Sequence, residues 1–334
     1  MVSRNPLTSR AERSERLSRA QTKRRCLLNS LFICTLLLIG CTPASPSPVP
    51  VQPSETPPLP TATSVPETAT TLPDDAARIR NAEYQLGATD SLGVVQLTDG
   101  KFQQGTAGEP DYVSVNLTDF VATGDLNGDG VNEVAALVGE NYGGSGTFVF
   151  LAVYSDVNGK LTFQTSTLVD DRPALNALSI ENGEVLVDAA TRDADDPFCC
   201  PTLRTNRHYR LLIENQLQMT DFTSFTPDNR PRTITIEAPA NGTTVDSSVQ
   251  MKGTVAIAPF ENTLAFRIFS TGDVELAAGS IPVSTAEMGG PGTFDSIISL
   301  GNILSGAVVR IEIQDLSAAD GSLLAMDSVE LVVK

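Results

Sequence analysis

One nine-residue segment carries oxygen-bearing groups at a spacing that suits a hard cation. Its candidate ligands are four side chains and one backbone carbonyl, from Asp125, Asn127, Asp129, Val131 (the carbonyl) and Glu133. Gly130 allows a sharp turn among them, and Ca²⁺ in proteins prefers carboxylate, amide and carbonyl oxygens. The segment therefore predicts a calcium-binding loop. The alternative is a turn without metal, because Asn, Asp and Gly favour turns in any case.

The flanks of this loop favour strands over helices. The segments 120–123 and 134–138 are rich in Val and Ala, and Ala136 stands where an EF-hand would need its bidentate Glu. The segment resembles the calcium hairpin of integrin-type FG-GAP repeats. Those repeats build propellers from several copies, whereas this chain has one copy. The resemblance therefore implies the loop and its calcium, and no propeller.

A second reactive feature is the adjacent pair Cys199 and Cys200, within the segment 196–202, Asp-Pro-Phe-Cys-Cys-Pro-Thr. In an oxidising compartment such a pair can form a disulfide. We expect this disulfide to stiffen a loop. Three alternatives stay open: pairing between chains, two reduced thiols, and redox or metal chemistry. Zinc is the weakest of these, because structural zinc usually takes four ligands and no histidine lies nearby.

Candidates for catalysis are sparse. His208 is the only histidine, and no Gly-x-Ser-x-Gly nucleophile motif is present. The Gly-rich segment 143–146 lacks the Lys of a phosphate-binding loop. Asp193, Asp195 and Asp196 could supply paired carboxylates, or simply form a solvated loop. The sequence predicts a non-enzymatic protein, with an envelope hydrolase that uses carboxylates of residues 76–225 as the alternative.

The N-terminus has the pattern of an export signal. Eight basic residues lie between Arg4 and Arg25, an apolar run covers 26–40, and Leu38-Ile-Gly leads to Cys41. This pattern resembles the bacterial lipoprotein signal. The resemblance implies that residues 1–40 are a signal peptide, that Cys41 is lipidated, and that the protein is anchored extracytoplasmically to a bacterial membrane. An uncleaved signal anchor is the alternative, and both the general and the twin-arginine export routes remain open.

Charge and composition limit the partners. The chain has a formal charge of −17, and removal of residues 1–40 leaves 15 basic and 38 acidic residues, a charge of −23. Such acidity excludes nucleic acid as a partner. Residues 41–75 hold ten of the 21 prolines and predict a disordered Pro/Thr-rich linker. We expect the chain to contact the membrane through its lipid and to bind an envelope protein or a cell-wall polymer.

The remaining chain is expected to be mainly β, in two domains joined by a hinge at 226–231. Residues 76–225 predict a β-rich domain that opens with a short helix over 75–85, with the α+β class as the alternative. Its expected strands are Ser91–Leu97, Val113–Thr123, Val134–Val138, Thr147–Tyr154, Lys160–Leu168, Ala174–Ile180, Glu184–Ala190 and His208–Glu214.

Residues 232–334 predict an immunoglobulin-like β-sandwich, because seven short strands follow one another over about 100 residues. The strands are Thr233–Glu237, Val249–Val255, Thr263–Phe269, Val274–Gly279, Phe294–Leu300, Val308–Gln314 and Ser328–Val333. Its turns and strand starts at 238–245, 266–269, 292–295 and 313–321 resemble the immunoglobulin-like domain associated with bacterial spore germination. That resemblance implies an extracytoplasmic adhesion or assembly module.

Overall fold

The computed structural model describes residues 73–87, 93–212, 216–301 and 303–334. They belong to one compact unit that spans 63–334. Cys41, the predicted signal peptide and nearly all of the predicted linker lie outside the described residues. Within the described part of the chain, no helix is both long enough and apolar enough to cross a membrane.

The described chain is mainly β, as predicted, with 60% of it in strands. Its one α-helix is α1 (Pro73–Ile79), which is shorter than the predicted helix over 75–85. After a turn in which the Asn81 amide donates to the Arg78 carbonyl, the chain enters β1 (Glu83–Gln85). This strand pairs with β2 (Val94–Gln96) in a small antiparallel sheet, so the end of the predicted helix is wrong.

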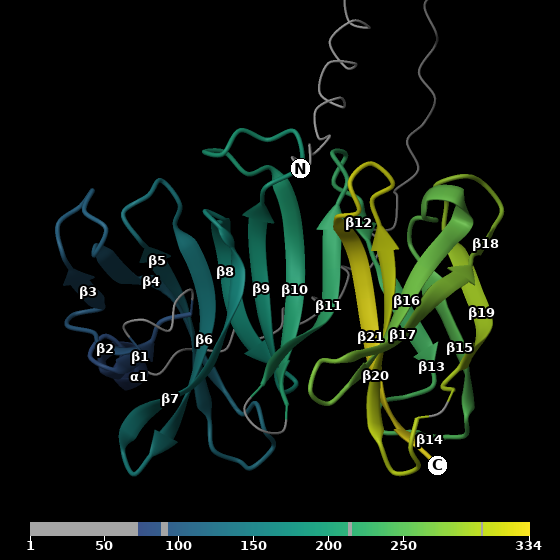
Figure 1. Cartoon of the computed structure of the whole chain (residues 1–334), viewed down its shortest axis with the longest axis horizontal. Coiled ribbons are helices and arrows are strands. Elements are labelled where there is room, and N and C mark those ends of the chain that lie inside the picture. The colour runs from purple at the N-terminus through teal and green to yellow at the C-terminus, as the bar shows by residue number, and fades with distance from the viewer. Residues whose placement is uncertain (1–72, 88–92, 213–215, 302) are drawn as a thin grey trace, which may run out of the picture. The chain divides into compact units, whose positions relative to one another are not determined.

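A five-stranded antiparallel meander follows (Figure 1). Its strands are β3 (Lys101–Gln104), β4 (Val113–Gly124), β5 (Glu133–Asn141), β6 (Phe148–Val157) and β7 (Lys160–Asp171). Both faces of its centre are buried, because β5 is buried at all but its last residue. One face packs against α1, β1 and β2 around Tyr84 and Tyr154. The other face packs through Leu137 and Leu151 against the next sheet.

That next sheet has ten strands and crosses the predicted domain boundary. Its main path runs β17-β16-β20-β21-β11-β10-β9-β8, while β12 pairs with β11 and β14 pairs in parallel with β21. From the first half of the chain come β8 (Ala174–Glu181), β9 (Glu184–Thr191), β10 (Leu203–Leu211) and β11 (Leu217–Phe225). From the second come β12 (Pro231–Arg232), β14 (Thr244–Val245), β16 (Thr263–Ser270), β17 (Glu275–Pro282), β20 (Val308–Leu316) and β21 (Leu323–Val333).

A four-stranded sheet completes the C-terminal sandwich. It contains β13 (Ile234–Ala238), β15 (Ser248–Val255), β18 (Ser284–Thr285) and β19 (Gly292–Ser299), in the order β13-β15-β19-β18. Met251 and Phe294 from this sheet pack against Ile268, Ile311 and Leu331 of the ten-stranded sheet. The C-terminal part is therefore an immunoglobulin-like sandwich, as predicted.

The two parts of the ten-stranded sheet meet at a short joint between β11 and β21. Only three residue pairs form it, namely Asp221 with Asp327, Phe222 with Met326, and Thr223 with Ala325. The segment 226–231, predicted as a hinge, is a hydrogen-bonded turn. In this turn the Arg230 amide donates to the Thr226 hydroxyl at 2.9 Å. After it, β12 returns to pair with the end of β11.

The sheet buries opposite faces on the two sides of this joint. In β10, Tyr209 faces the core shared with the five-stranded sheet, so His208 lies on the opposite face. His208 is directly opposite Asp221, and Asp221 is opposite Asp327, so these three side chains share one face. In β21 that same face carries Val329, which is part of the sandwich core. The face of the ten-stranded sheet that is polar at His208 in β10 is therefore buried in the sandwich core at Val329 in β21, two strands away.

Candidate functional site

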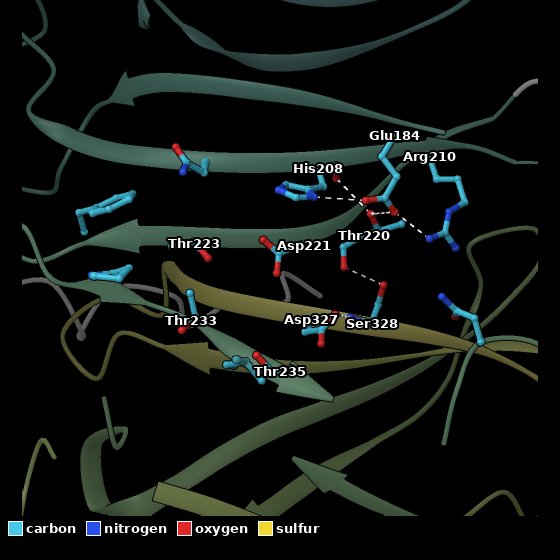
Figure 2. Close-up of a pocket in the computed structure, with 15 residues that line it drawn as sticks. Glu184, His208, Arg210, Thr220, Asp221, Thr223, Thr233, Thr235, Asp327 and Ser328 are labelled. Atoms are coloured by element: carbon cyan, nitrogen blue, oxygen red, sulfur yellow. Dashed lines mark hydrogen bonds and ion pairs between the residues drawn. The ribbon is translucent and has the colours of Figure 1, made fainter. Parts of the chain in front are cut away.

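A cavity of about 530 Å³ lies where this change of face occurs (Figure 2). Strands β9, β10, β11 and β21 form its floor, and residues at the start of β13 line it from the four-stranded sheet. Its polar lining residues are Glu184, Asn206, His208, Arg210, Thr220, Asp221, Thr223, Thr233, Thr235, Asn241, Asp327 and Ser328. Phe225, Pro231 and Ile234 supply the apolar lining. The volume is in the range of small-molecule sites, while the lining is more polar than usual.

Glu184 is held as an ionised carboxylate at one end of the cavity. It lies 3.2 Å from His208 Nδ1, and accepts from Arg210 at 2.7 Å and from the Thr220 hydroxyl at 3.3 Å. The hydrogen bond with His208 and the Arg210 charge lower the pKa of Glu184. The same hydrogen bond raises the pKa of His208. Glu184 is therefore paired with two basic side chains, His208 and Arg210, and these contacts fix the positions of both.

Asp221 and Asp327 lack such a partner. Among the described residues, neither forms an ion pair with a Lys, Arg or His side chain. Burial raises the pKa of Asp221 to about 7 and also raises the pKa of Asp327. Asp327 is oriented by two backbone amides, those of Ile236 and Ser328, each at 2.7 Å. The cavity therefore holds two half-buried carboxyl groups side by side, near the His208 charge but without an ion pair of their own.

The cavity also contains an acceptor that has no donor. Asn206 Oδ1 is buried and makes no hydrogen bond. Asn206 is opposite Thr223 in the ladder, so it lies on the same face as His208. Buried polar atoms normally have a partner, and an exception calls for an explanation. Less than 1 Å² of this oxygen is accessible, so it is an unsatisfied buried acceptor beneath the cavity lining.

The predicted calcium loop joins β4 to β5, with strands on both sides as expected. Within it, Asp125 accepts from the amides of Gly128 at 2.7 Å and Gly130 at 3.0 Å. These backbone hydrogen bonds lower the pKa of Asp125. Glu133 is almost fully buried, 1% exposed, and accepts from the Leu126 amide at 2.9 Å. The loop therefore positions its carboxylates through its own backbone.

The candidate ligands of this loop do converge. The Asn127 side-chain nitrogen lies 3.2 Å from Asp129 Oδ2 and 3.4 Å from Glu133 Oε1, so three of the predicted side chains meet. The Asn127 oxygen accepts from the Asp129 amide, and the Val131 amide donates to Asp129. No group of three or more His, Cys, Asp or Glu residues among the described residues is arranged to hold a metal. A cation here would require Asn127 to turn its oxygen inward.

Cys199 and Cys200 are joined by a disulfide in the loop between β9 and β10. The loop also presents Phe198, which is 63% exposed and lies under the guanidinium groups of Arg192 at 4.2 Å and Arg172 at 5.4 Å. A smaller cavity of about 370 Å³ adjoins it, lined partly by Asp170, Asp171, Arg172, Arg192, Asp193, Phe198 and Asp320.

The acidic cluster in the same loop has a structural role. Asp196 accepts from the Asp193 amide at 2.9 Å and from both the amide and the hydroxyl of Thr202, at 2.7 and 2.8 Å. These bonds lower the pKa of Asp196. Asp196 therefore closes the loop, while Asp193 and Asp195 are exposed.

The cavity of about 530 Å³ beside the joint between β11 and β21 is called the junction cavity below. Three of its lining residues were not predicted as site residues from the sequence. Glu184, Asp221 and Asp327 come from three strands and are brought together only by the pairing of β9, β10, β11 and β21. No local spacing links positions so far apart in the chain. The one available signal was Asp327 in β21, a strand whose other residues are apolar except Ser328 and Glu330.

Comparison with known proteins finds a family match for one part of the chain. Residues 233–322 match the family model of the immunoglobulin-like domain of bacterial spore germination, Gmad2, which confirms the predicted resemblance of this part. No curated protein matches the chain. A solved structure, a mutant of the C-terminally truncated trimeric ectodomain of the C. elegans fusion protein EFF-1, shows 10% identity over 66% of this chain and 77% of its own. The TM-score between that structure and this chain is 0.19.

Proposed function

We propose that this chain is a non-enzymatic, lipid-anchored protein of the bacterial cell envelope, and that its folded part binds an envelope protein or a wall polymer. The observation that carries the proposal is the polar junction cavity of about 530 Å³. It lies between a β-rich half and a half that matches an immunoglobulin-like module. A site that draws on both halves is suited to recognition, because its walls are fixed by paired strands.

The location is argued from the N-terminal sequence. Cys41 follows an apolar run and precedes a Pro-rich segment, in the pattern of a lipidated cysteine. One acyl chain holds a protein only marginally, whereas several hold it stably. Labelled palmitate should therefore enter the wild type and not Cys41→Ser, and Cys41→Ser should leave the membrane fraction. Equal labelling of the two forms would refute the anchor.

Binding is tested by sedimentation of the full chain with isolated, insoluble cell-wall material. Thr235 is exposed and lines the cavity, so Thr235→Trp should fill the cavity without disturbing a core. We expect Thr235→Trp to lose co-sedimentation. Thr162→Trp, at an exposed position of β7 away from the cavity, is the matched control and should bind like the wild type. If both variants sediment like the wild type, the cavity is not the binding site.

One observation favours the alternative, an envelope hydrolase. Glu184 and Asp221 both come from residues 76–225 and line one cavity, yet their pKa values shift in opposite directions. An acid and a base for hydrolysis are typically separated in this way. Release of soluble fragments from wall material by the wild type, and its loss in Asp221→Asn, would establish this alternative over binding.

We also propose calcium as a ligand of the loop between β4 and β5. The proposal is supported by the meeting of Asn127, Asp129 and Glu133. It also agrees with the proposed extracytoplasmic location, where weak calcium modules suffice. A bound cation would relieve the repulsion between carboxylates that the loop holds together. Calcium would then stiffen the β4–β5 hairpin.

A further inference from the structure

The junction cavity has a ligand chemistry of its own. We propose that it binds a polyhydroxylated ligand, a sugar unit of an envelope glycan. This inference rests on the proposed binding function and narrows it to one class of ligand. It is carried by the free hydrogen-bonding groups of the cavity, by its charge and by its size.

Among its described lining residues, the cavity offers an anionic ligand no cation that is free of a carboxylate partner. The cations Arg210 and His208 are both engaged by Glu184, at 2.7 and 3.2 Å. The remaining ionisable groups that line the cavity are the carboxyl groups of Asp221 and Asp327. An anion would meet these groups without a free positive partner, in a chain that already carries a formal charge of −17.

The free polar groups match hydroxyls. Asp221 and Asp327 both line the cavity with carboxyl oxygens, and neither forms an ion pair among the described residues. From the opposite wall, the hydroxyls of Thr233 and Thr235 line the cavity (Figure 2). A sugar hydroxyl both donates and accepts, so one ring can satisfy acceptors on the floor and hydroxyls on the facing wall. An ammonium ion only donates, and would leave the threonine hydrogens without an acceptor.

The dimensions and the apolar part of the lining fit the same class. A volume of about 530 Å³ accommodates one or two sugar rings. Phe225 and Pro231 adjoin the polar groups, and the C–H face of a sugar ring can pack on such a surface. Arg204 covers the Phe225 ring at 4.4 Å, which holds this ring in place. A purely apolar ligand would leave the carboxyl groups buried and unpaired, which is costly.

The test is calorimetric titration of the full chain in a detergent without a sugar headgroup. The probes are chitotriose, maltotriose and mannotriose, with ethylenediamine as the cationic probe. We expect saturable binding of at least one trisaccharide. Thr235→Val removes one hydroxyl from an exposed position and should weaken this binding about fivefold, the effect of one hydrogen bond. Thr162→Val, at an exposed position of β7, should leave trisaccharide binding unchanged.

Asp221→Asn gives an independent check, because it retains the shape of the side chain and replaces an acceptor oxygen by a donor. We expect it to weaken the trisaccharide further than Thr235→Val does. Absence of saturable binding for all three trisaccharides overturns the inference, as does binding of ethylenediamine alone. If wall material still co-sediments in an Asp221- or Thr235-dependent manner while the sugars fail, the proposed function stands and only the ligand class falls.

Discussion

At the scale of residues, the contrast between Glu184 and Asp221 defines the site. Glu184 has His208 and Arg210 within hydrogen-bonding distance, so its charge is neutralised and its oxygens are satisfied. Asp221 faces Asp327 and forms no ion pair, and burial raises its pKa to about 7 although the His208 charge and a hydrogen bond with Thr223 act in the opposite direction. A free carboxyl group that is half neutral near neutrality is able to both donate and accept. This property makes the cavity receptive to a ligand.

The pairing of Cys199 with Cys200 is tested at this same scale. Signal removal and lipidation would leave these two as the only unmodified cysteines of the mature chain. We expect no free thiol in the denatured, non-reduced mature protein, and two after reduction, by alkylation and mass spectrometry. Cys200→Ser is the control and should show one thiol without reduction. Two free thiols, or a disulfide-linked dimer, would contradict the disulfide.

Calcium should stabilise the loop residues that now repel one another. Extracellular modules bind Ca²⁺ with dissociation constants of roughly 10⁻⁴–10⁻³ M, and a tenfold excess over that value contributes about 1.4 kcal/mol. The melting temperature should then rise by roughly 3–6 °C. Asp129→Ala should abolish the rise, and Asp246→Ala, an exposed residue outside the loop, should not. Identical melting in chelator and in millimolar calcium would mean that the loop is an ordinary turn.

At the scale of elements, the joint between β11 and β21 is the feature that the sequence revealed least. β11 was not among the predicted strands. Its segment mixes Thr, Asp and Ser with Met and Phe, and a bulge opposite His208 and Tyr209 breaks its alternation. β11 is stabilised by pairing with β10 on one side and β21 on the other, and a local sequence pattern does not reveal such pairing. The cavity depends on this strand, so its residues could not be assembled from the sequence.

Other elements were more predictable because their signals are local. The meander strands alternate or run apolar between Gly-containing turns, and the sandwich strands follow at regular spacing. The predicted strands therefore overlap β4 to β9, β13, β15 to β17 and β19 to β21, while the two-residue β18 was missed. The loop at 125–133 was found because its ligands are neighbours. The helix end was misplaced, because β1 forms only when β2 pairs with it. The predicted end of β10 at Glu214 lies outside the described residues.

The joint should weaken as pH rises. The folded-state pKa of Asp221 is about 7, above its ordinary value of 3.8, so the folded state binds more protons than the unfolded state between these values. Stability from this group is therefore present at low pH and is lost as pH approaches 7. Asp327 acts in the same direction. The pKa of folded His208 is raised above its ordinary value of 6.5. His208 therefore stabilises the fold below pH 6.5, and this stabilisation is lost as the pH rises through the raised pKa.

Urea unfolding at pH 5.5 and pH 8 measures this dependence. We expect the free energy of unfolding to be lower at pH 8 by on the order of 1–2 kcal/mol. Glu184 opposes this trend only in more acidic solution, because its pKa is lowered. Asp221→Asn should flatten the dependence, whereas Asp295→Asn, at an exposed site with a lowered pKa, should preserve it. Stability that rises from pH 5.5 to 8 would contradict the protonated joint.

At the scale of the whole molecule, one sheet connects separate hydrophobic cores. The sandwich core draws only on residues from Ile234 to Val333. The two cores of the first half draw on residues from Ile79 to Tyr209. Only three residue pairs of β11 and β21 span the joint, and one of these pairs is two carboxyl groups. Because the ladder between the halves is this short, we expect it to add little cooperativity.

Because each half buries its own apolar surface, we expect the full chain to show two thermal transitions by calorimetry. Met251→Ala, in the sandwich core, should destabilise one transition by about 2–5 kcal/mol and leave the other within a degree or so. Leu137→Ala, fully buried between the first two sheets, is the matched variant and should do the reverse. Ca²⁺ should move only the transition that Leu137→Ala moves. If instead both substitutions lower one shared transition, the ten-stranded sheet makes the molecule a single cooperative unit, and the junction cavity would then open only on global unfolding.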